Sequence, residues 1–259
     1  MIRLFTSFYA ESNPTRQKEI LECLERNLAL PEIDEVCLLV ENTAAPLEHS
    51  KLKTRPTTKR PEYRDMLDWA KEEQLGPLDL SIVCNSDIYF DSTIAIFETQ
   101  LRPNQCAALS RWNVNPDGSA SLYFHNDSQD TWIFSGAIRE FVDTYPIGVP
   151  RCDNRIMHEL RTAGYHVINP SLSVKSYHLH AGEREAYGHE NQGWFVDPPY
   201  GYQWPHNLFS LPGTLFNNLF NRQRRVRWQL NVRQIKTSLP GRICCRIASM
   251  LKSSTPAAQ

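Results

Sequence analysis

The 259-residue chain has no uninterrupted apolar run long enough to cross a membrane. A spanning helix needs about 20 mostly apolar residues, and the amino-terminal segment MIRLFTSFYAESNP contains only a short apolar stretch. That stretch is typical of a first β-strand rather than of a signal peptide. We therefore expect the protein to lie in the cytoplasm.

The cysteines lack the C-x-x-C spacing of zinc ribbons, and their odd number does not suit a disulfide framework. Most lie within apolar runs, which predicts reduced thiols in the core; the seven are Cys23, Cys37, Cys84, Cys106, Cys152, Cys244 and Cys245. Internal repeats and low-complexity tracts are also missing. With 41% hydrophobic residues, the chain has enough apolar surface for one large α/β domain or two small ones.

Acidic residues are absent from Arg222 onward, where nine basic residues occur. The first 221 residues hold the other 19 basic residues and all 29 acidic ones, so the two parts differ strongly in charge. This difference predicts a compact domain over residues 1–210 and a basic amphipathic extension over residues 211–259.

Residues 222–252 of this extension mix arginine with apolar side chains, and Ile243, Ile247 and Met250 recur at helical spacing. This pattern is typical of a helix that lies on an anionic membrane surface, which would make the protein peripheral on the cytoplasmic face. A helix packed on its own domain and a contact with a partner protein are the alternatives. We expect no nucleic acid partner, because the region carries no recognised nucleic-acid motif.

Strands and helices alternate in the amino-terminal part. A strand is predicted over residues 2–9, followed by a helix after Asn13-Pro14 and a buried strand over residues 35–42. The next helix begins near Pro61 and leads to a third strand that ends at Asn85. This order predicts a parallel sheet with right-handed crossovers.

Ligands of parallel α/β sheets bind beyond the carboxyl ends of the strands. Five residues lie at these ends and are predicted substrate or cation contacts: Thr6, Phe8, Glu41, Asn85 and Asp87.

After about residue 105, short segments at 106–112, 121–126 and 130–136 are separated by turn residues, which predicts hairpins. Arg111 and Trp112 end the first segment, and Asp130 begins the third; we predict that these three contact substrate. A helix follows from about Asp153 and ends at Gly164.

The segment SVKSYHLH places His178 and His180 on one face of a strand. The two imidazoles can share a metal ion, or one can bind the metal while the other contacts a phosphate. Together with Asp87 they would form a mixed oxygen and nitrogen site suited to Mn²⁺ or Mg²⁺. An H-x-H pair also arises by chance.

Asp153 precedes the helix and is either its N-cap or a general base that faces the binding cleft. Arg60 and Arg184 are either phosphate contacts or solvated surface charges. The segment 187–207 contains six aromatic residues and can form a mobile lid, an acceptor platform or an ordered loop packed on the domain.

Taken together, the alternating elements, the segment VCNSDIYFD, the pattern CDNRI..EL...GY.V and the late HLH resemble nucleotide-sugar-dependent glycosyltransferases of the GT-A fold, over roughly residues 2–187. The resemblance implies a Rossmann-like, mostly parallel sheet with a second small antiparallel part. Asn85-Ser86-Asp87 is similar to the family's D-x-D motif, with asparagine in place of its first aspartate. That motif holds a divalent cation on the nucleotide diphosphate, and the missing carboxylate should weaken cation binding.

The resemblance also implies residue roles. His180 or His178 would complete the cation site, Asp153 would take the acceptor proton with inversion at the anomeric carbon, and Glu41 would contact the base or ribose. The implied activity is transfer of a sugar from a nucleotide-diphosphate donor to a hydroxyl of a glycan or lipid-linked acceptor, in polysaccharide or glycoconjugate biosynthesis. Two alternatives remain: a metal-dependent hydrolase that uses the H-x-H pair, and a catalytically weak nucleotide-sugar-binding protein.

Overall fold

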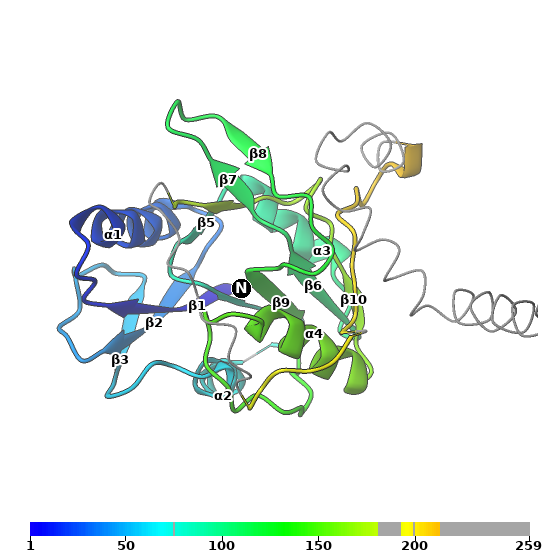
Figure 1. The fold of residues 1–259 in the computed structure, drawn as a ribbon, viewed down its shortest axis with the longest axis horizontal. Helices are drawn as coiled ribbons and strands as arrows, with labels where there is room; N and C mark the ends of the chain where they lie inside the picture. The colour runs from blue at the N-terminus through cyan, green and yellow to red at the C-terminus, as the bar shows by residue number, and fades with distance from the viewer. Residues whose placement is uncertain (75, 181–192, 199, 213–259) are drawn as a thin grey trace, which may run out of the picture.

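The computed structural model describes residues 1–74, 76–180, 193–198 and 200–212, which form an α/β arrangement with helices on both sides of a large sheet (Figure 1). The elements follow one another as β1 (Ile2–Tyr9), α1 (Pro14–Ala29), β2 (Glu35–Glu41), β3 (Leu52–Thr57), α2 (Tyr63–Glu73), β4 (Leu80–Cys84), β5 (Ile88–Phe90), a 3₁₀ turn (Ser92–Ile96), α3 (Phe97–Gln100), β6 (Gln105–Leu109), β7 (Trp112–Val114), β8 (Ala120–Leu122), β9 (Thr131–Ser135), α4 (Cys152–Thr162), β10 (His166–Ile168) and β11 (Ser176–His178).

The large sheet has seven strands in the order β10-β6-β9-β4-β1-β2-β3. Strands β3, β2, β1 and β4 are parallel to one another, whereas β9 runs antiparallel to both of its neighbours, β4 and β6. The predicted βαβ unit is present as β1-α1-β2. The predicted fold class, a mostly parallel α/β sheet with a smaller second sheet, is confirmed.

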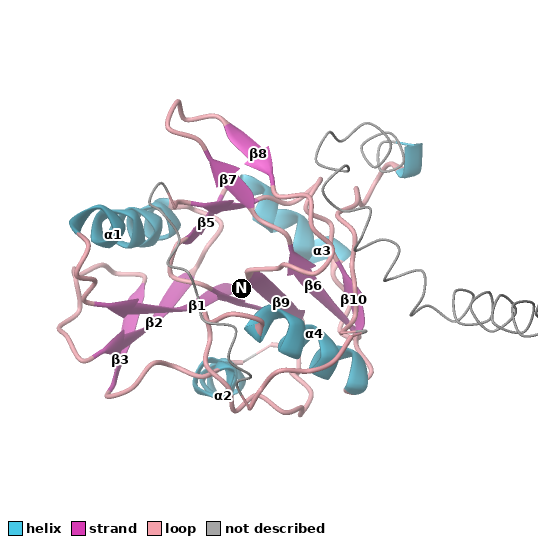
Figure 2. Cartoon of the chain, viewed as in Figure 1, coloured by secondary structure: helices cyan, strands magenta, loops and turns pink. Residues whose placement is uncertain are grey.

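Both faces of the large sheet are buried. In β1 and β2, consecutive residues are buried rather than alternate ones, as expected for strands covered on both sides. Leu4 faces a core that includes Ile20 and Leu24 of α1 and Phe97 of α3. Phe5 faces the opposite core, which includes side chains of α2 and α4. The sheet is therefore covered by α1 and α3 on one side and by α2 and α4 on the other (Figure 2).

Two predicted helix ends and one predicted helix face are present in the structure. The Asn13 side chain accepts hydrogen bonds from the backbone N–H groups of Thr15 and Arg16, at 3.0 and 3.3 Å, and so caps α1. Gly164 follows α4 with φ +80°, a left-handed conformation that glycine adopts without strain. The predicted apolar face of α2 is buried in the second core.

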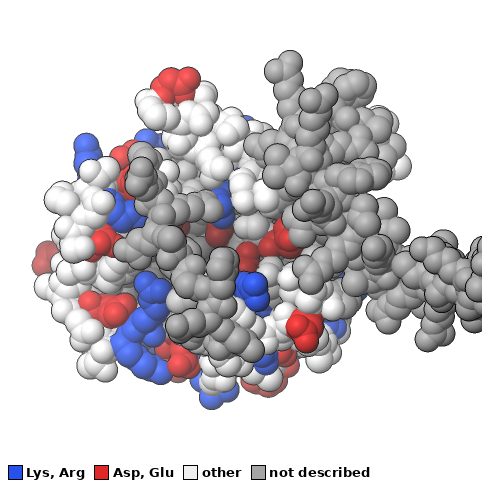
Figure 3. All heavy atoms as spheres, in the orientation of Figure 1, with Lys and Arg blue, Asp and Glu red and all other residues white. Residues whose placement is uncertain are grey.

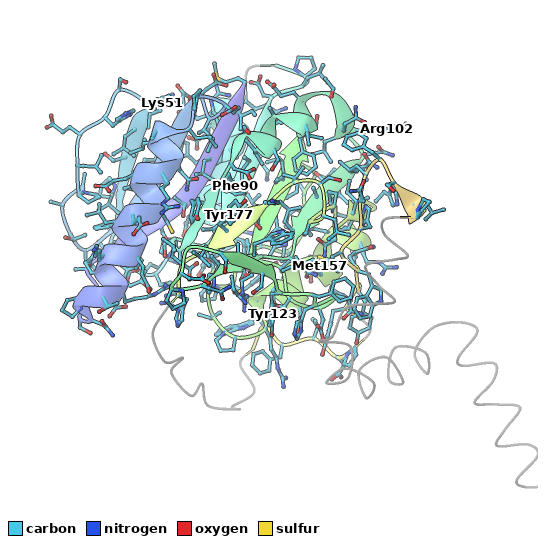
Figure 4. The ribbon with its side chains drawn as sticks, turned by 90° about the horizontal axis from the view of Figure 1, so that it is seen from above. Lys51, Phe90, Arg102, Tyr123, Met157 and Tyr177 are labelled. Carbon is cyan, nitrogen blue, oxygen red and sulfur yellow. The ribbon has the colours of Figure 1, made fainter. Side chains whose placement is uncertain are left out.

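A second sheet of four strands, in the order β5-β11-β7-β8, lies beside the carboxyl ends of the large sheet. Strand β11 pairs antiparallel with β5 and parallel with β7, and β7 forms a hairpin with β8. The view from above shows the neighbourhood of Tyr177 of β11 and Phe90 of β5, where the register pairs Tyr177 with Tyr89 and Ser176 with Phe90 (Figure 4). Of the hairpins predicted over residues 106–136, β7-β8 is a true hairpin; β6 and β9 instead join the large sheet. The short strands β3 and β5 were not predicted.

The described cysteines, Cys23, Cys37, Cys84, Cys106 and Cys152, are buried and free, as predicted. None of the helices in the described part of the chain is long and apolar enough to span a membrane. The predicted membrane-binding residues 222–252, Cys244, Cys245 and Arg184 lie outside the described residues. The roles assigned to them stay predictions.

Candidate active site

A cavity of about 470 Å³ opens at the carboxyl ends of β1, β2 and β4, against the start of α4. Acidic and basic side chains gather around a hollow in the middle of this face (Figure 3). Nine of the predicted site residues line the cavity: Glu41, Arg60, Asn85, Asp87, Arg111, Asp130, Asp153, His178 and His180. Residues that are more than 100 positions apart in the sequence are therefore brought to one site.

Thr6, Phe8 and Trp112 do not line the cavity, and strand alternation explains why. Even-numbered residues of β1 point to the α1 side, so Phe8 is 6% exposed in the first core. Ser7 and Tyr9 line the cavity instead. On β7, Asn113 approaches His178, while the adjacent Trp112 donates its indole N–H to the Ser171 carbonyl at 2.8 Å. The predicted substrate contacts of Thr6, Phe8 and Trp112 have no support in this geometry.

Asp87, His178 and His180 form a cluster in which one ligand atom of each lies within 4.8 Å of the others. The antiparallel pairing of β5 with β11 produces this convergence, since His178 lies opposite Ile88 and Leu179 N–H donates to the Asp87 carbonyl at 3.1 Å. The two imidazole rings are stacked, with centroids 5.5 Å apart. His178 Nε2 lies 3.0 Å from Asp87 Oδ2.

Arg16, which the sequence did not reveal as a site residue, makes an ion pair with Asp87. Its guanidinium donates to Asp87 Oδ2 at 2.5 Å and to the Leu179 carbonyl at 2.8 Å. Burial alone would raise the pKa of Asp87, but His178 and Arg16 outweigh it and hold this pKa well below its usual range. Asp87 is therefore ionised at every physiological pH.

Two atoms of the cluster are buried and have no hydrogen-bond partner in the described part of the chain: Asp87 Oδ1 and His180 Nε2. Burial, Arg16 and His178 lower the pKa of His180, which keeps its imidazole neutral. An ionised carboxylate oxygen and a neutral imidazole nitrogen are the donor forms that a divalent cation requires. The residues thus fit such an ion, with Asp87 and His180 as its ligands. His178 has oxygen neighbours at both ring nitrogens, Asp87 Oδ2 and Asn113 Oδ1, so its contact orients Asp87.

A second group of side chains surrounds Asp130. Asn85 Nδ2 donates to Asp130 Oδ1 at 3.1 Å, and Arg111 donates to Asp130 Oδ2 at 2.5 Å. Both oxygens of Asp130 are thus occupied by donors. This geometry gives a physical reason for asparagine at position 85: an aspartate there would place two carboxylates in contact.

Replacing Asn85 with aspartate would restore the D-x-D pattern, but we expect it to lower the stability of the folded protein. Two adjacent carboxylates raise each other's pKa, so the loss, about 1–3 kcal/mol, applies at pH 8 and disappears near pH 4 as one carboxyl protonates. Thermal unfolding from pH 4 to 8 measures it. The double variant Asn85→Asp with Asp130→Asn restores an amide–carboxylate pair and should recover part of the stability, because Arg111 then lacks its partner carboxylate at position 130. Equal stability of Asn85→Asp and the wild type at pH 8 would contradict this account.

Asp153 lies in the first turn of α4, where it is not the N-cap. That position belongs to Arg151, with a left-handed φ of 64°. The Asp153 carboxylate accepts a hydrogen bond at 2.9 Å from Asn154 N–H, its partner among the described residues. Burial, with the charges of Asp130 and Asp127, raises the pKa of Asp153 to about 7. A carboxylate with this pKa in a cavity suits general base catalysis, and the N-cap interpretation is wrong.

The described aromatic residues of segment 187–207 pack on the domain. Trp194 donates its indole N–H to the Pro150 carbonyl at 3.3 Å, and the Arg151 guanidinium lies 4.5 Å from the centre of the Phe195 ring. Trp204 packs on Phe124, with ring centroids 5.3 Å apart. For these residues the ordered-loop interpretation applies. Tyr187 lies outside the described residues.

Comparison by sequence finds no matching family model and no similar curated protein. Solved structures similar in fold include S. aureus TarS 1-349, at 12% identity and a TM-score of 0.42, covering 68% of this chain and 60% of that chain. HddC from Yersinia pseudotuberculosis has 13% identity and a TM-score of 0.31, covering 52% of this chain and 77% of that chain. A 2-C-methyl-D-erythritol 4-phosphate cytidylyltransferase from Francisella tularensis has 12% identity and a TM-score of 0.35, covering 52% and 72%. At these TM-scores the similarity carries no argument about activity.

Proposed function

We propose that this chain is a glycosyltransferase that moves a sugar from a nucleotide-diphosphate donor to a hydroxyl of a glycan or lipid-linked acceptor, in polysaccharide or glycoconjugate biosynthesis. One observation carries the proposal. A single cavity holds Asp87 and His180, which fit a divalent cation, and Asp153, which fits a general base. Cation and base are the two groups that displacement of a nucleoside diphosphate by a hydroxyl needs.

The charge of the cavity supports a cation-bound donor. Among the described residues, its lining contains six carboxylates, four guanidinium groups and no lysine, a surplus of two negative charges when all of them are ionised. The diphosphate of a nucleotide-sugar is itself a dianion and would be repelled by this surface. A bound Mn²⁺ or Mg²⁺ would neutralise the diphosphate and stabilise the charge that grows on it as it leaves.

The residues of the chain then have distinct tasks. Asp153 accepts the proton of the acceptor hydroxyl as its oxygen bonds to the anomeric carbon and the bond from that carbon to the diphosphate oxygen breaks. Arg16 and Arg60, which line the cavity, place positive charge near the departing diphosphate. Displacement by one attacking hydroxyl, with one base and no covalent enzyme intermediate, inverts the anomeric configuration.

The test measures sugar transfer and donor hydrolysis with UDP-sugars, GDP-sugars and CMP-sugars, each with Mn²⁺, Mg²⁺ or EDTA. We expect turnover of a diphosphate donor that requires the cation, and no turnover of CMP-sugars, which carry a single phosphate. Cation-dependent cleavage of simple phosphate or amide substrates without sugar transfer would favour the hydrolase. Donor binding without turnover, with a broad panel of acceptors present, would favour the binding protein.

A further inference from the structure

Gln129 is a fully buried amide in the cavity wall. The residue is 0% exposed and is one of those that line the cavity, yet neither Nε2 nor Oε1 of its side chain has a hydrogen-bond partner within the described residues. Buried amides of folded proteins are normally paired, because an unpaired one loses its hydrogen bonds to water without replacement. An unpaired donor and an unpaired acceptor at a cavity wall point to a ligand with both kinds of group.

Asn85 adds a third unpaired atom to the same cavity. Its Nδ2 donates to Asp130 Oδ1 at 3.1 Å, and this contact fixes the amide orientation, since Oδ1 in that place would face a carboxylate. Asn85 Oδ1 is consequently an acceptor, buried and without a partner in the described part of the chain. One donor and two acceptors match hydroxyl groups, each of which can both donate and accept.

These atoms lie between the two reactive parts of the site. Asn85 is two residues before Asp87 and bonds to Asp130, whose charge raises the pKa of Asp153. In a displacement reaction the transferred sugar must occupy the space between the leaving diphosphate and the base. The unpaired side-chain atoms of Gln129 and Asn85 would therefore lie beside the transferred sugar.

The surrounding charge restricts which sugar fits. Arg111 shares Asp130 with Asn85, and its guanidinium donates to Asp130 at 2.5 Å and to Asn113 at 3.2 Å. The carboxylates of Asp130 and Asp153 line the same wall. A sugar carboxylate beside Asp130 and Asp153 would meet like charges.

We propose that Gln129 and Asn85 bind hydroxyl groups of the transferred sugar and that the site selects a neutral sugar over a sugar acid. This inference rests on the proposed function and adds the class of sugar to it. Gln129 is thereby a specificity-determining residue.

The test is isothermal titration of the full chain, in Mn²⁺, with UDP, GDP, UDP-glucose, UDP-galactose, UDP-N-acetylglucosamine, GDP-mannose and UDP-glucuronate. We expect at least one neutral donor to bind more tightly than its nucleoside diphosphate, and UDP-glucuronate to bind more weakly than UDP-glucose. Gln129→Met should lose roughly tenfold in affinity for that donor and keep its affinity for the nucleoside diphosphate. It should also match or exceed the wild-type melting temperature, because the unpaired amide is removed; Gln129→Leu replaces it if the methionine variant fails to fold.

Asn126→Leu is the matched control. Asn126 is 1% exposed, both of its side-chain amide atoms lack partners within the described residues, and it does not line the cavity. Its variant should bind donors like the wild type. Unchanged donor affinity in Gln129→Met, a preference for UDP-glucuronate, or no gain from any neutral sugar overturns this inference alone. Failure of both UDP and GDP to bind overturns the proposed function as well.

Discussion

Replacing Asp153 with asparagine is expected to lower kcat for sugar transfer by about 100-fold or more and, at the same time, to stabilise the fold above pH 7. The first effect follows because an amide cannot accept the acceptor proton. Donor binding should change little, since the cation ligands Asp87 and His180 are untouched. Measuring kcat, and separately the donor affinity by titration, distinguishes a loss of catalysis from a loss of donor binding.

The stabilisation follows from the pKa of Asp153, about 7 in the folded protein against about 4 in an unfolded chain. Between these values the folded state binds more protons, so the carboxyl weakens the fold progressively as pH rises from 4 to 7. Asparagine carries no charge to desolvate and removes this penalty, which amounts to roughly 2–4 kcal/mol above pH 7. Thermal unfolding of both proteins at pH 4.5 and pH 8 measures the difference, which should be present only at the higher pH.

Asp127→Asn is the matched control for Asp153. Burial also raises the pKa of Asp127, but this residue does not line the cavity. Its variant should gain stability at high pH and keep kcat at pH 8 within a few-fold of the wild type, because Asp153 is largely ionised at that pH with or without the charge of Asp127. If Asp153→Asn and the wild type turned over donor equally fast, Asp153 would not be the base.

The pH–rate profile of the wild type gives a further check. Its kcat should decrease as the pH is lowered below about 7, because the base must be ionised.

The second large effect is expected from Asp87→Asn, which should abolish cation-dependent turnover and destabilise the protein by about 3 kcal/mol. The carboxylate is both a proposed cation ligand and the partner of Arg16 and His178. An amide leaves the largely buried guanidinium of Arg16 without its counter-charge at this position. Because the folded pKa of Asp87 lies well below its usual value, the wild-type advantage should persist above pH 4 and disappear only in strong acid.

Asp91→Asn provides the control at the end of the same strand. Asp91 follows β5, caps the 3₁₀ turn and accepts a hydrogen bond from Tyr177, but it does not line the cavity. This variant should lose some stability and keep its affinity for Mn²⁺. Asp87→Asn with wild-type Mn²⁺ affinity would remove Asp87 from the cation site.

Local patterns in the sequence were sufficient for the elements that position the site. The Asn13 cap, the continuous apolar run of β2 and the strand end at Asn85 each act within a few residues, and the structure has all three. The meeting of Asp87 with His178 and His180 depends instead on β5 pairing with β11. That pairing joins residues about 90 positions apart, and no local signal in the sequence predicts it.

The missed residues depend on tertiary structure. Arg16 appears in the sequence as an exposed residue in the first turn of a helix; its contact with Asp87 spans 71 positions. Gln129 resembles a turn residue, and only the packing around it shows that it is buried. The sequence does not separate Thr6 and Phe8 from Ser7 and Tyr9, because alternation defines two faces of β1 but does not say which face α1 covers. Only the packing of α1 on the sheet shows which face of β1 is covered and which faces the cavity.

The central claim is that Asp87 and His180 hold a divalent cation against a nucleoside diphosphate. Titration of Mn²⁺ into the protein with and without UDP or GDP tests it most directly, with the cation signal followed by electron paramagnetic resonance. The account predicts that one of these diphosphates tightens Mn²⁺ binding at least tenfold, that Mn²⁺ tightens the diphosphate by the same factor, and that His180→Ala loses the coupling. Mn²⁺ affinity that neither diphosphate changes, or that His180→Ala retains in full, would contradict it.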